Sequence, residues 1–256
     1  MDFLIGLLLS IVIAFMAYRK KSLDTSGFIS ATVVGTLLYV FGTYILFSLL
    51  IFFFISSSIF TKIKTNVEDK KGRSAVQVLA NSLMALIFSI AFYITSRYEF
   101  LYIGGIAIAA STSDTWASEI GKLSKGKVFS ILNFKMMDKG ESGGISILGL
   151  FASFVGSFII SILFILLLST YTTISLNDWW IVVVMTIGGL LGSILDSYLG
   201  ILIQEKYIDH QGRILEKVKS RKMFKKLSGI SFINNDFVNF LMTFIITLLF
   251  SLILIK

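Results

Sequence analysis

The segment from Ser111 to Gly121 carries two carboxylates next to an apolar stretch. Asp114 and Ser118 lie four residues apart and share one face of a helix, and Glu119 is offset by a further ~100°. Mg²⁺ binds one or two carboxylates together with the phosphates of a substrate. An alternative is that Ser113 or Asp114 caps the start of a surface helix. The spacing makes Asp114 and Glu119 candidate catalytic and magnesium-binding residues.

A third carboxylate, Asp196, lies between glycines in another apolar segment. Gly192, Asp196 and Gly200 repeat every four residues and therefore share one helix face. The glycines alone indicate close helix packing, with Asp196 hydrogen-bonded to a neighbour. A carboxylate at the centre of this bare face favours a ligand or metal ion that approaches closely. We therefore interpret Asp196 as catalytic and magnesium-binding, and Ser197 beside it as a phosphate contact.

A glycine-rich turn leads into the apolar segment that begins at Ile145. Such a turn leaves backbone N–H groups free at a helix start, where they bind phosphate and other anions. The alternative is a flexible linker, which would explain the glycines but not their combination with lysine and serine. The candidate phosphate-binding residues of this turn are Lys139, Ser142, Gly143, Gly144 and Ser146.

Further polar residues stand at the start of two other apolar segments. Gln77 and Asn81 share one helix face, and Asn235 could also serve as a helix cap. Amides inside membrane spans also form hydrogen bonds between helices, so each is weak evidence by itself. The candidate polar contacts are Arg73, Gln77, Asn81, Asn235 and Asn239, with Asp236 as a further acidic candidate.

The elements that carry these residues are predicted to be membrane-spanning helices. The 256 residues are 55% hydrophobic and 15% charged, with a mean hydropathy of +0.87. A soluble domain carries about 25% charged residues. Cysteine is absent and His210 is the only histidine, which excludes disulfides, thiolate metal sites and Ser-His triads. Proline is also absent, so breaks in the spans are expected at glycines.

Apolar windows predict an all-α polytopic transmembrane helix bundle, a single domain over residues 1–256 with about eight spans. The second and fifth spans are short for a hydrocarbon core of about 30 Å. The N-terminus lacks a basic region and a cleavage signal, so the first span is expected to be retained. The spans are Phe3–Tyr18, Phe28–Phe41, Tyr44–Phe60, Val76–Thr95, Leu101–Ser113, Ile145–Leu168, Trp179–Ile203 and Phe237–Ile255.

The distribution of positive charge predicts the orientation. Four segments contain 21 of the 23 Lys and Arg residues, and eight spans place all four on one side. The positive-inside rule makes that side cytosolic and both termini extracytosolic. This orientation requires two crossings joined at Gly42–Thr43. The net charge of +8 is then explained by the topology and by contact with anionic membrane lipids, and we expect no nucleic-acid partner. The segment Lys206–Lys226 is the main candidate for the contact with lipids.

These motifs resemble those of an integral membrane family that includes transmembrane protein 19 and the plant phytyl-phosphate kinase of the vitamin E pathway. The segment from Ser113 to Gly121 is the most specific match, whereas the basic segment from Tyr207 to Lys226 matches no family motif. The matching blocks run in order across nearly the whole chain: Asp24 to Gly27, Ala31 to Gly35, Arg73 to Asn81, Ser113 to Gly121, Gly140 to Ser146, Gly192 to Gly200 and Asn235 to Asn239.

The resemblance implies Mg²⁺-dependent transfer of a phosphoryl group from a nucleoside triphosphate such as CTP. The acceptor would be an isoprenoid monophosphate, for example phytyl or geranylgeranyl phosphate, at the cytosolic face. It also implies four acidic metal-binding positions: Asp114, Glu119, Asp196 and Asp236. A phosphomonoester is largely dianionic at pH 7 and needs no general base, which suits a chain with one peripheral histidine.

Two other functions remain open at this point. A lipid cytidylyltransferase that uses CTP would need similar residues and would release pyrophosphate. A lipid or ion transporter could use an intramembrane carboxylate and glycine-broken spans, although charges gathered at one face argue against it. A non-catalytic scaffold is a further alternative. In every case we expect a multi-pass integral membrane protein, located in the cell membrane if the source is prokaryotic; the oligomeric state does not follow.

Overall fold

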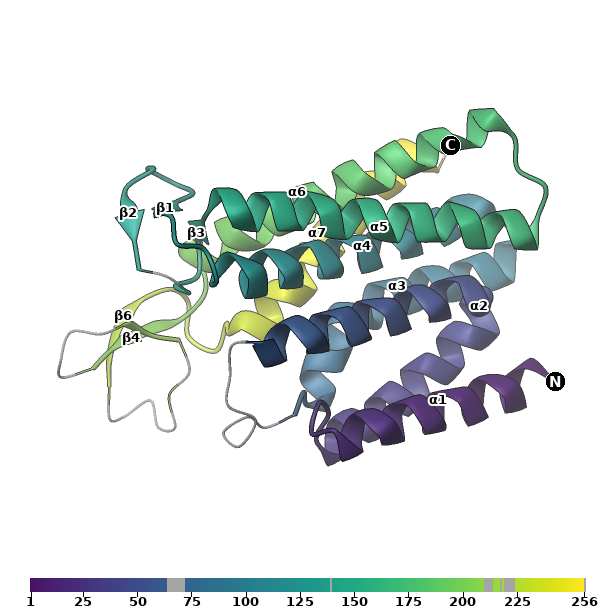
Figure 1. The fold of residues 1–256 in the computed structure, drawn as a ribbon, viewed down its shortest axis with the longest axis horizontal. Coiled ribbons are helices and arrows are strands. Elements are labelled where there is room, and N and C mark those ends of the chain that lie inside the picture. The colour runs from purple at the N-terminus through teal and green to yellow at the C-terminus, as the bar shows by residue number, and fades with distance from the viewer. Residues whose placement is uncertain (64–71, 139, 210–213, 217, 219–223, 256) are drawn as a thin grey trace.

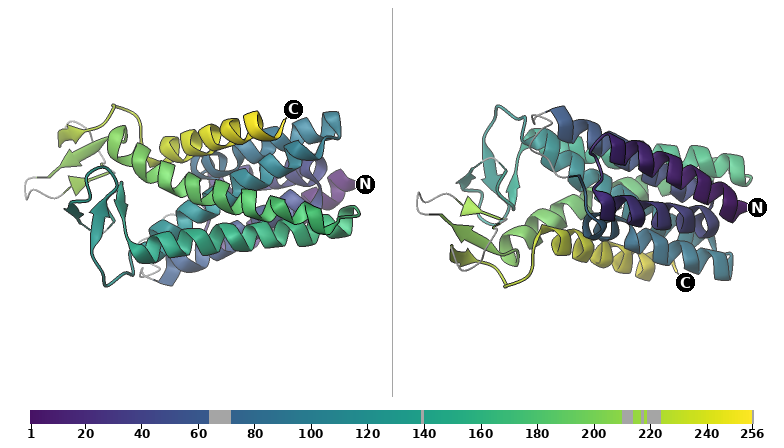
Figure 2. Two further views of the ribbon diagram at one scale, coloured as in Figure 1. Left: turned by 90° about the horizontal axis from the view of Figure 1, so that it is seen from above. Right: turned by 90° about the horizontal axis from the view of Figure 1, so that it is seen from below.

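The computed structural model describes residues 1–63, 72–138, 140–209, 214–216, 218 and 224–255, and most of them are helical. The helices lie lengthwise in one bundle (Figures 1 and 2). In the described residues the α-helices are α1 (Asp2–Arg19), α2 (Thr25–Ile63), α3 (Ala75–Thr95), α4 (Tyr98–Gly121), α5 (Ile147–Tyr171), α6 (Trp180–Leu202) and α7 (Asn235–Leu254); the short 3₁₀ helix η2 (Leu176–Trp179) precedes α6.

Helix α2 consists of two halves that fold back on each other. Thr43 has a φ of 59° and a ψ of −179°, which ends the first half. A Cβ atom added to Gly35 would lie 3.5 Å from the ring of Phe47, although twelve residues of continuous helix span about 18 Å. The chain therefore reverses at Gly42–Thr43, as predicted from the charge distribution (Figure 1). The residue with positive φ is Thr43, not the expected glycine.

Helix α4 is longer than the predicted fifth span and lies in the centre of the bundle. It continues past Ser113 to Gly121, so Asp114 and Glu119 lie in its last two turns. The alternative interpretation of Ser113 or Asp114 as the cap of a new helix is therefore wrong. Nearly all residues from Leu101 to Asp114 are buried, because neighbouring helices surround α4 on all sides. A span in this position needs no lipid-facing surface and tolerates polar residues.

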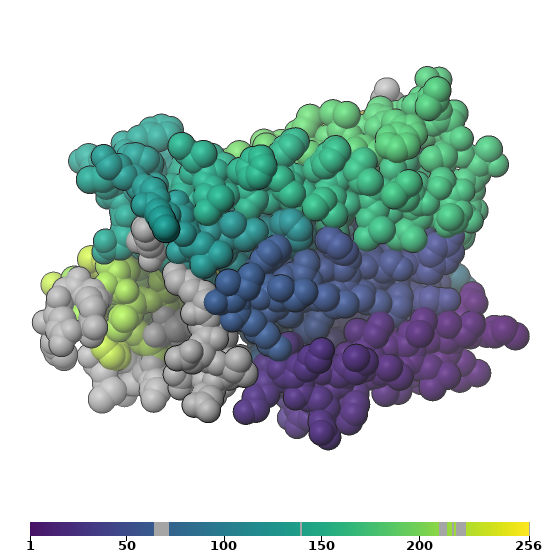
Figure 3. All heavy atoms as spheres, viewed as in Figure 1, coloured from purple at the N-terminus to yellow at the C-terminus, as the bar shows by residue number. Residues whose placement is uncertain are grey.

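Six helical segments of the described chain are long and apolar enough to cross a membrane: α1, α2, α3, α5, η2 together with α6, and α7. Large apolar side chains cover the outside of the bundle, for example Phe151 (64% exposed) and Val183 (59% exposed). Such an exposed apolar surface is stable in lipid and not in water. Figure 3 shows one side of this surface, with α1 along its lower edge. The protein is therefore a multi-pass membrane protein.

Two small antiparallel sheets extend the bundle at the end opposite to both termini (Figures 1 and 2). Their presence corrects the all-α prediction. The sixth span also begins at Ile147, and not at Ile145, because Ile145 belongs to a strand. One sheet has the order β2-β1-β3 and the other β5-β4-β6. The strands are β1 (Val128–Ser130), β2 (Met136–Met137), β3 (Gly144–Ile145), β4 (Lys206–Ile208), β5 (Ile214–Leu215) and β6 (Lys225–Ser228).

Candidate functional site

A cavity of about 500 Å³ opens at the end of the bundle that carries the sheets. The second half of α2, helices α3 to α7 and the glycine-rich turn all contribute to its walls. Every predicted site residue that the structure describes lines this cavity, and Lys139 lies outside the described residues. These residues are Arg73, Gln77, Asn81, Asp114, Glu119, Ser142, Gly143, Gly144, Ser146, Asp196, Ser197, Asn235, Asp236 and Asn239.

Close packing of two helices brings the central carboxylates together. A Cβ atom on Gly192 of α6 would lie 2.6 Å from the Cβ of Ala110 on α4, so only glycine fits there. Asp196 and Asp114 follow these two residues by one turn each, on the same faces. Because α4 and α6 run in the same direction, the two carboxylates meet. The packing interpretation of the glycines is thus confirmed, and the packing itself positions Asp196.

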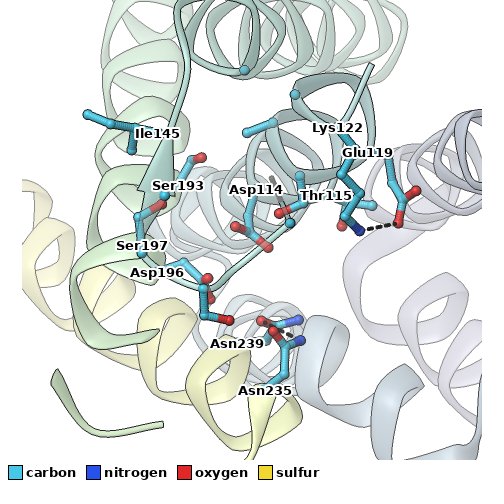
Figure 4. A pocket seen from close by; sticks show the side chains of 18 of the residues that line it. Asp114, Thr115, Glu119, Lys122, Ile145, Ser193, Asp196, Ser197, Asn235 and Asn239 are labelled. Carbon is cyan, nitrogen blue, oxygen red and sulfur yellow. Dashed lines mark hydrogen bonds and ion pairs between the residues drawn. The ribbon is translucent and has the colours of Figure 1, made fainter. Parts of the chain in front are cut away.

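The side chains of Asp114 and Asp196 lie close enough to interact with each other. Figure 4 shows both pointing into the cavity. Asp114 is 7% exposed, whereas Asp196 is half-buried. The Asn239 side-chain amide donates to Oδ2 of Asp196 at 3.0 Å when its nitrogen faces the carboxylate. Asn239 therefore orients Asp196 from α7.

The other two predicted metal ligands stand further apart. Glu119 lies 3.5 Å from the ammonium group of Lys122, and Asp236 lines the same cavity from the first turn of α7. Among the described residues, no three His, Asp or Glu side chains gather closely enough to bind a metal ion by themselves. The arrangement therefore offers one facing pair, Asp114 and Asp196, and four further carboxylates line the same cavity: Glu119, Glu141, Glu216 and Asp236.

Not every residue of the most specific motif faces the cavity. Ser113 hydrogen-bonds to the backbone oxygen of Ser153 at 2.8 Å, and the indole N–H of Trp116 donates to Ser56 at 3.1 Å. These two residues fasten α4 to α5 and α2. Asp114, Ser118 and Glu119 line the cavity instead. The motif thus combines a packing face with a polar face.

The glycine-rich turn is already hydrogen-bonded at several points. The Ser146 hydroxyl accepts from the backbone N–H of Gly149 at 3.0 Å and caps α5, so this side chain has a structural partner. The backbone N–H of Ser142 donates to Oε1 of Glu216 at 2.6 Å. Gly143 has a φ of +89°, and a Cβ atom there would lie 2.5 Å from Ile201. The backbone of the turn therefore approaches α6 as closely as only glycine permits.

The segment after α6 holds this turn in place. Lys206, 3% exposed, donates to the carbonyl oxygen of Ser142 at 2.8 Å and lies 3.3 Å from Glu141. Three residues that line the cavity, Lys122, Ser193 and Glu216, were not predicted from the sequence, nor was the contact of Lys206 with the turn. A lysine buried this deeply is rare unless it is paired, but the sequence does not reveal its partner. The expected contact of Lys206–Lys226 with anionic lipids therefore does not apply to Lys206 itself.

Arg73 lies on the opposite wall, in the loop before α3. Its backbone N–H donates to Ser22, and its carbonyl accepts from Asp24 at 3.1 Å, so the α1–α2 loop fixes its position. A Cβ on Gly27 would lie 2.0 Å from that carbonyl, which explains the glycine of the first motif. Burial lowers the pKa of the Arg73 guanidinium and nearby Glu119 raises it, but an arginine stays charged at neutral pH.

The amides beside Arg73 have mixed roles. The Gln77 side-chain oxygen accepts from the backbone N–H of Ser74 at 3.1 Å and so closes the first turn of α3. The Asn81 amide nitrogen donates to the backbone of Gln77, while its Oδ1 is buried and receives no hydrogen bond from the described residues. On α7, the helix cap is Asn234, not the predicted Asn235. Asn81 therefore has a buried acceptor oxygen that no described residue satisfies.

Comparison with known proteins agrees with this architecture. The chain is 31% identical to Protein PGR of Arabidopsis thaliana, over 96% of this chain and 94% of that protein. It is 34% identical to the uncharacterized membrane protein MJ0933 of Methanocaldococcus jannaschii, over 80% of this chain and 84% of that protein. No solved structure matches. The model of the family described as integral membrane protein DUF92 matches residues 8–247, and the chain therefore belongs to this family.

Proposed function

We propose that this protein is a membrane-embedded isoprenoid-monophosphate kinase. It would transfer a phosphoryl group from a nucleoside triphosphate such as CTP to a prenyl phosphate such as phytyl or geranylgeranyl phosphate. The observation that carries this proposal is the facing pair Asp114 and Asp196 in one cavity with a fixed arginine and a glycine-rich turn. Such a combination serves a polyphosphate that binds together with a divalent cation.

The donor set suits Mg²⁺ as a cofactor. Mg²⁺ keeps several waters and binds through one or two carboxylates plus substrate phosphates, so a facing carboxylate pair is sufficient. Asp114 and Asp196 would hold the ion, and Glu119 and Asp236 would act from the rim. The bound ion would neutralise charge on the phosphates during transfer.

The two walls of the cavity suggest two phosphate subsites. The glycine-rich turn, with Ser142, Gly143 and Ser197, would hold the nucleotide phosphates through backbone and hydroxyl groups. Arg73 on the opposite wall would hold the lipid phosphate through two parallel hydrogen bonds. The Asn81 side-chain nitrogen, which already donates one N–H to Gln77, would donate its second N–H to the same phosphate. Asp114 and Asp196 stand between these walls, where the transferred group would pass. The acceptor phosphate is already anionic, so no residue needs to remove a proton from it.

We further propose that eight helical segments, namely α1, the two halves of α2 and α3 to α7, cross the membrane with both termini on the extracytosolic side. The loops with most of the Lys and Arg residues would then surround the cavity, where anionic lipids and nucleotide are both available. Because the polar cavity lies at one end of the bundle and not at mid-depth, a transporter is less well supported. A cytidylyltransferase would use the same two subsites and is distinguished by its products.

The test is an activity screen of the purified protein with prenyl phosphates of several lengths and all four nucleoside triphosphates, with and without Mg²⁺. We expect a prenyl diphosphate and a nucleoside diphosphate, and no product after chelation of Mg²⁺. Released pyrophosphate would identify the cytidylyltransferase instead. No nucleotide consumption under any condition would rule out both.

A further inference from the structure

A second pocket lies between α1, both halves of α2 and the start of α3, and most of the residues that line it are apolar. Ile13 and Ala14 of α1 form one wall, and Ala31 and Gly35 of the first half of α2 form another. Phe47 and Phe54 mark its extent along the second half of α2, seven residues or roughly 10 Å. It is therefore a groove along the bundle and not a surface dimple.

The groove joins the polar cavity. Four residues line both the groove and the polar cavity: Phe53, Arg73, Gln77 and Asn81. The Arg73 guanidinium and the unpaired Asn81 oxygen therefore lie at the junction between the groove and the cavity. Arg73 lies 5.7 Å from the ring of Phe53 and 5.5 Å from that of Phe54, both groove residues. A ligand whose anionic group binds at Arg73 would thus place the rest of its chain in the apolar groove.

We propose that this groove binds the hydrocarbon chain of a single-chain lipid phosphate whose headgroup is held at Arg73. The proposal rests on the proposed function and specifies how its lipid substrate is oriented. Continuity with the polar cavity and the cation at the junction favour an amphiphile with a terminal phosphate over a wholly apolar ligand. The inner volume is about 70 Å³, which accommodates a few methylene groups of one chain and excludes the paired chains of a diacyl phospholipid, so the rest of a long chain would extend beyond the groove.

Helix α1 supplies the outer wall. Among the described elements its extensive contacts are with α2 alone, and its outer face is covered by exposed apolar residues such as Leu8 (64% exposed) and Val12 (56% exposed). The groove therefore lies beneath α1, which forms an edge of the bundle (Figure 3). The chain of a membrane lipid reaches this position from within the bilayer without crossing water.

The test is photo-crosslinking of the full-length protein in lipid nanodiscs, with an alkyl monophosphate that carries a diazirine halfway along its chain. We expect crosslinks in the peptides that contain Ile13, Ala31 or Phe54. An excess of geranylgeranyl phosphate should suppress them, and the same concentration of phosphatidic acid should not. Labelling spread over the lipid-facing sides of α5 and α6, or equal suppression by phosphatidic acid, would overturn the proposal.

A matched pair of variants on one helix sharpens the test. Ile13→Trp fills the groove, whereas Ile11→Trp adds the same indole on the lipid-facing side, where Ile11 is 39% exposed. We expect Ile13→Trp to reduce the competitor-sensitive crosslinking by about tenfold, since two or more methylene groups of the ligand lose their burial. Ile11→Trp should leave it unchanged. Ala31→Leu narrows the groove from its other wall and should act like Ile13→Trp if the latter fails to fold.

The outcome separates this inference from the proposed function. Groove-specific crosslinking without nucleotide consumption would support the lipid site and contradict the kinase. Formation of prenyl diphosphate with crosslinks elsewhere would support the kinase and overturn the groove.

Discussion

The backbone N–H of Ser142 donates a 2.6 Å hydrogen bond to Oε1 of Glu216, a residue 74 positions away in the chain. The Glu216 carboxylate therefore accepts a hydrogen bond from a backbone N–H group of the glycine-rich turn, the turn that we propose to bind the nucleotide phosphates. Glu216 also lines the cavity, as does Ser197. If a phosphate binds to this turn, it competes with the Glu216 side chain for the same donor.

Removal of this competitor should tighten nucleotide binding. We expect Glu216→Ala to lower the KM for nucleotide by up to about tenfold, the equivalent of one hydrogen bond to a charged group. Steady-state kinetics with varied nucleotide and saturating lipid phosphate measure this effect. Asp138→Ala removes a nearby exposed carboxylate and should leave the KM unchanged. A higher KM in Glu216→Ala would indicate that Glu216 helps to bind the substrate.

The facing carboxylates should be essential for activity but not for folding. We expect Asp114→Asn and Asp196→Asn each to reduce kcat by at least about a hundredfold, the scale of losing one charge-stabilising group. Neither variant should melt at a lower temperature, because an amide replaces a carboxylate that faces another carboxylate. Asp178→Asn, at the far end of the bundle, is the matched control and should retain full activity. Near-normal turnover in either site variant would exclude that residue from catalysis.

The contact between Gly192 and Ala110 predicts a rescue experiment. Gly192→Ala should destabilise the protein by about 1–3 kcal/mol, since the added methyl group overlaps Ala110. It should also lower activity, because Asp196 is displaced from Asp114. Ala110→Gly in the same chain should recover part of both losses, which a double-mutant cycle of thermal stability and kcat measures. Gly126→Ala in the loop after α4 is the control. Strictly additive effects would contradict the contact.

Arg73 should act on the lipid phosphate and not on the nucleotide. Arg73→Lys keeps the positive charge but loses the planar pair of donors, so we expect the KM for prenyl phosphate to rise about tenfold. The KM for nucleotide should stay constant. Arg97→Lys changes an arginine in an exposed ion pair with Glu99 and should affect neither constant. An equal rise of both constants in Arg73→Lys would contradict the assignment of separate subsites.

The proposed orientation in the membrane can be tested with introduced cysteines, since the chain has none of its own. Thr173→Cys lies between α5 and η2, and Lys125→Cys lies between α4 and β1. We expect a membrane-impermeant maleimide applied to intact cells to label Thr173→Cys only. Lys125→Cys should react after permeabilisation. The reverse pattern would invert the topology and place the cavity outside.

The sequence predicted the helices well because lipid imposes a simple rule, namely long apolar segments with satisfied backbones. It also predicted the reversal at Gly42–Thr43, since the basic loops otherwise fall on opposite sides. The strands were not predictable, because segments of two to four residues carry no periodic pattern. The length of α4 was underestimated for a related reason: a helix surrounded by protein does not need to be apolar at its end.

The residues that line the cavity were selected from the sequence because their types are costly in a membrane, as for Asp114 and Asp196. In the structure, the two carboxylates meet because each lies four residues after a residue of the contact between Gly192 and Ala110. The sequence shows the spacing of Gly192 and Asp196, but not that Ala110 is the residue against which Gly192 packs. Glu216 and Lys206 were missed because their roles depend on contacts between loops far apart in sequence. Gln77 was assigned to polar contacts with the ligand and Ser146 to phosphate, yet their side chains also complete the first turns of their own helices. Capping and ligand binding use the same residue types.

The direction of each helix adds a consequence of its own. Helices α3, α5 and α7 begin at the cavity, whereas α4 and α6 end there. Aligned peptide dipoles give a helix about half a positive charge at its start and half a negative charge at its end. The rim therefore has alternating polarity before any ionisable side chain is considered, with one set of termini suited to oxyanions and the other to a cation. The directions of the helices alone therefore make this end of the bundle suitable for an anion that binds together with a cation.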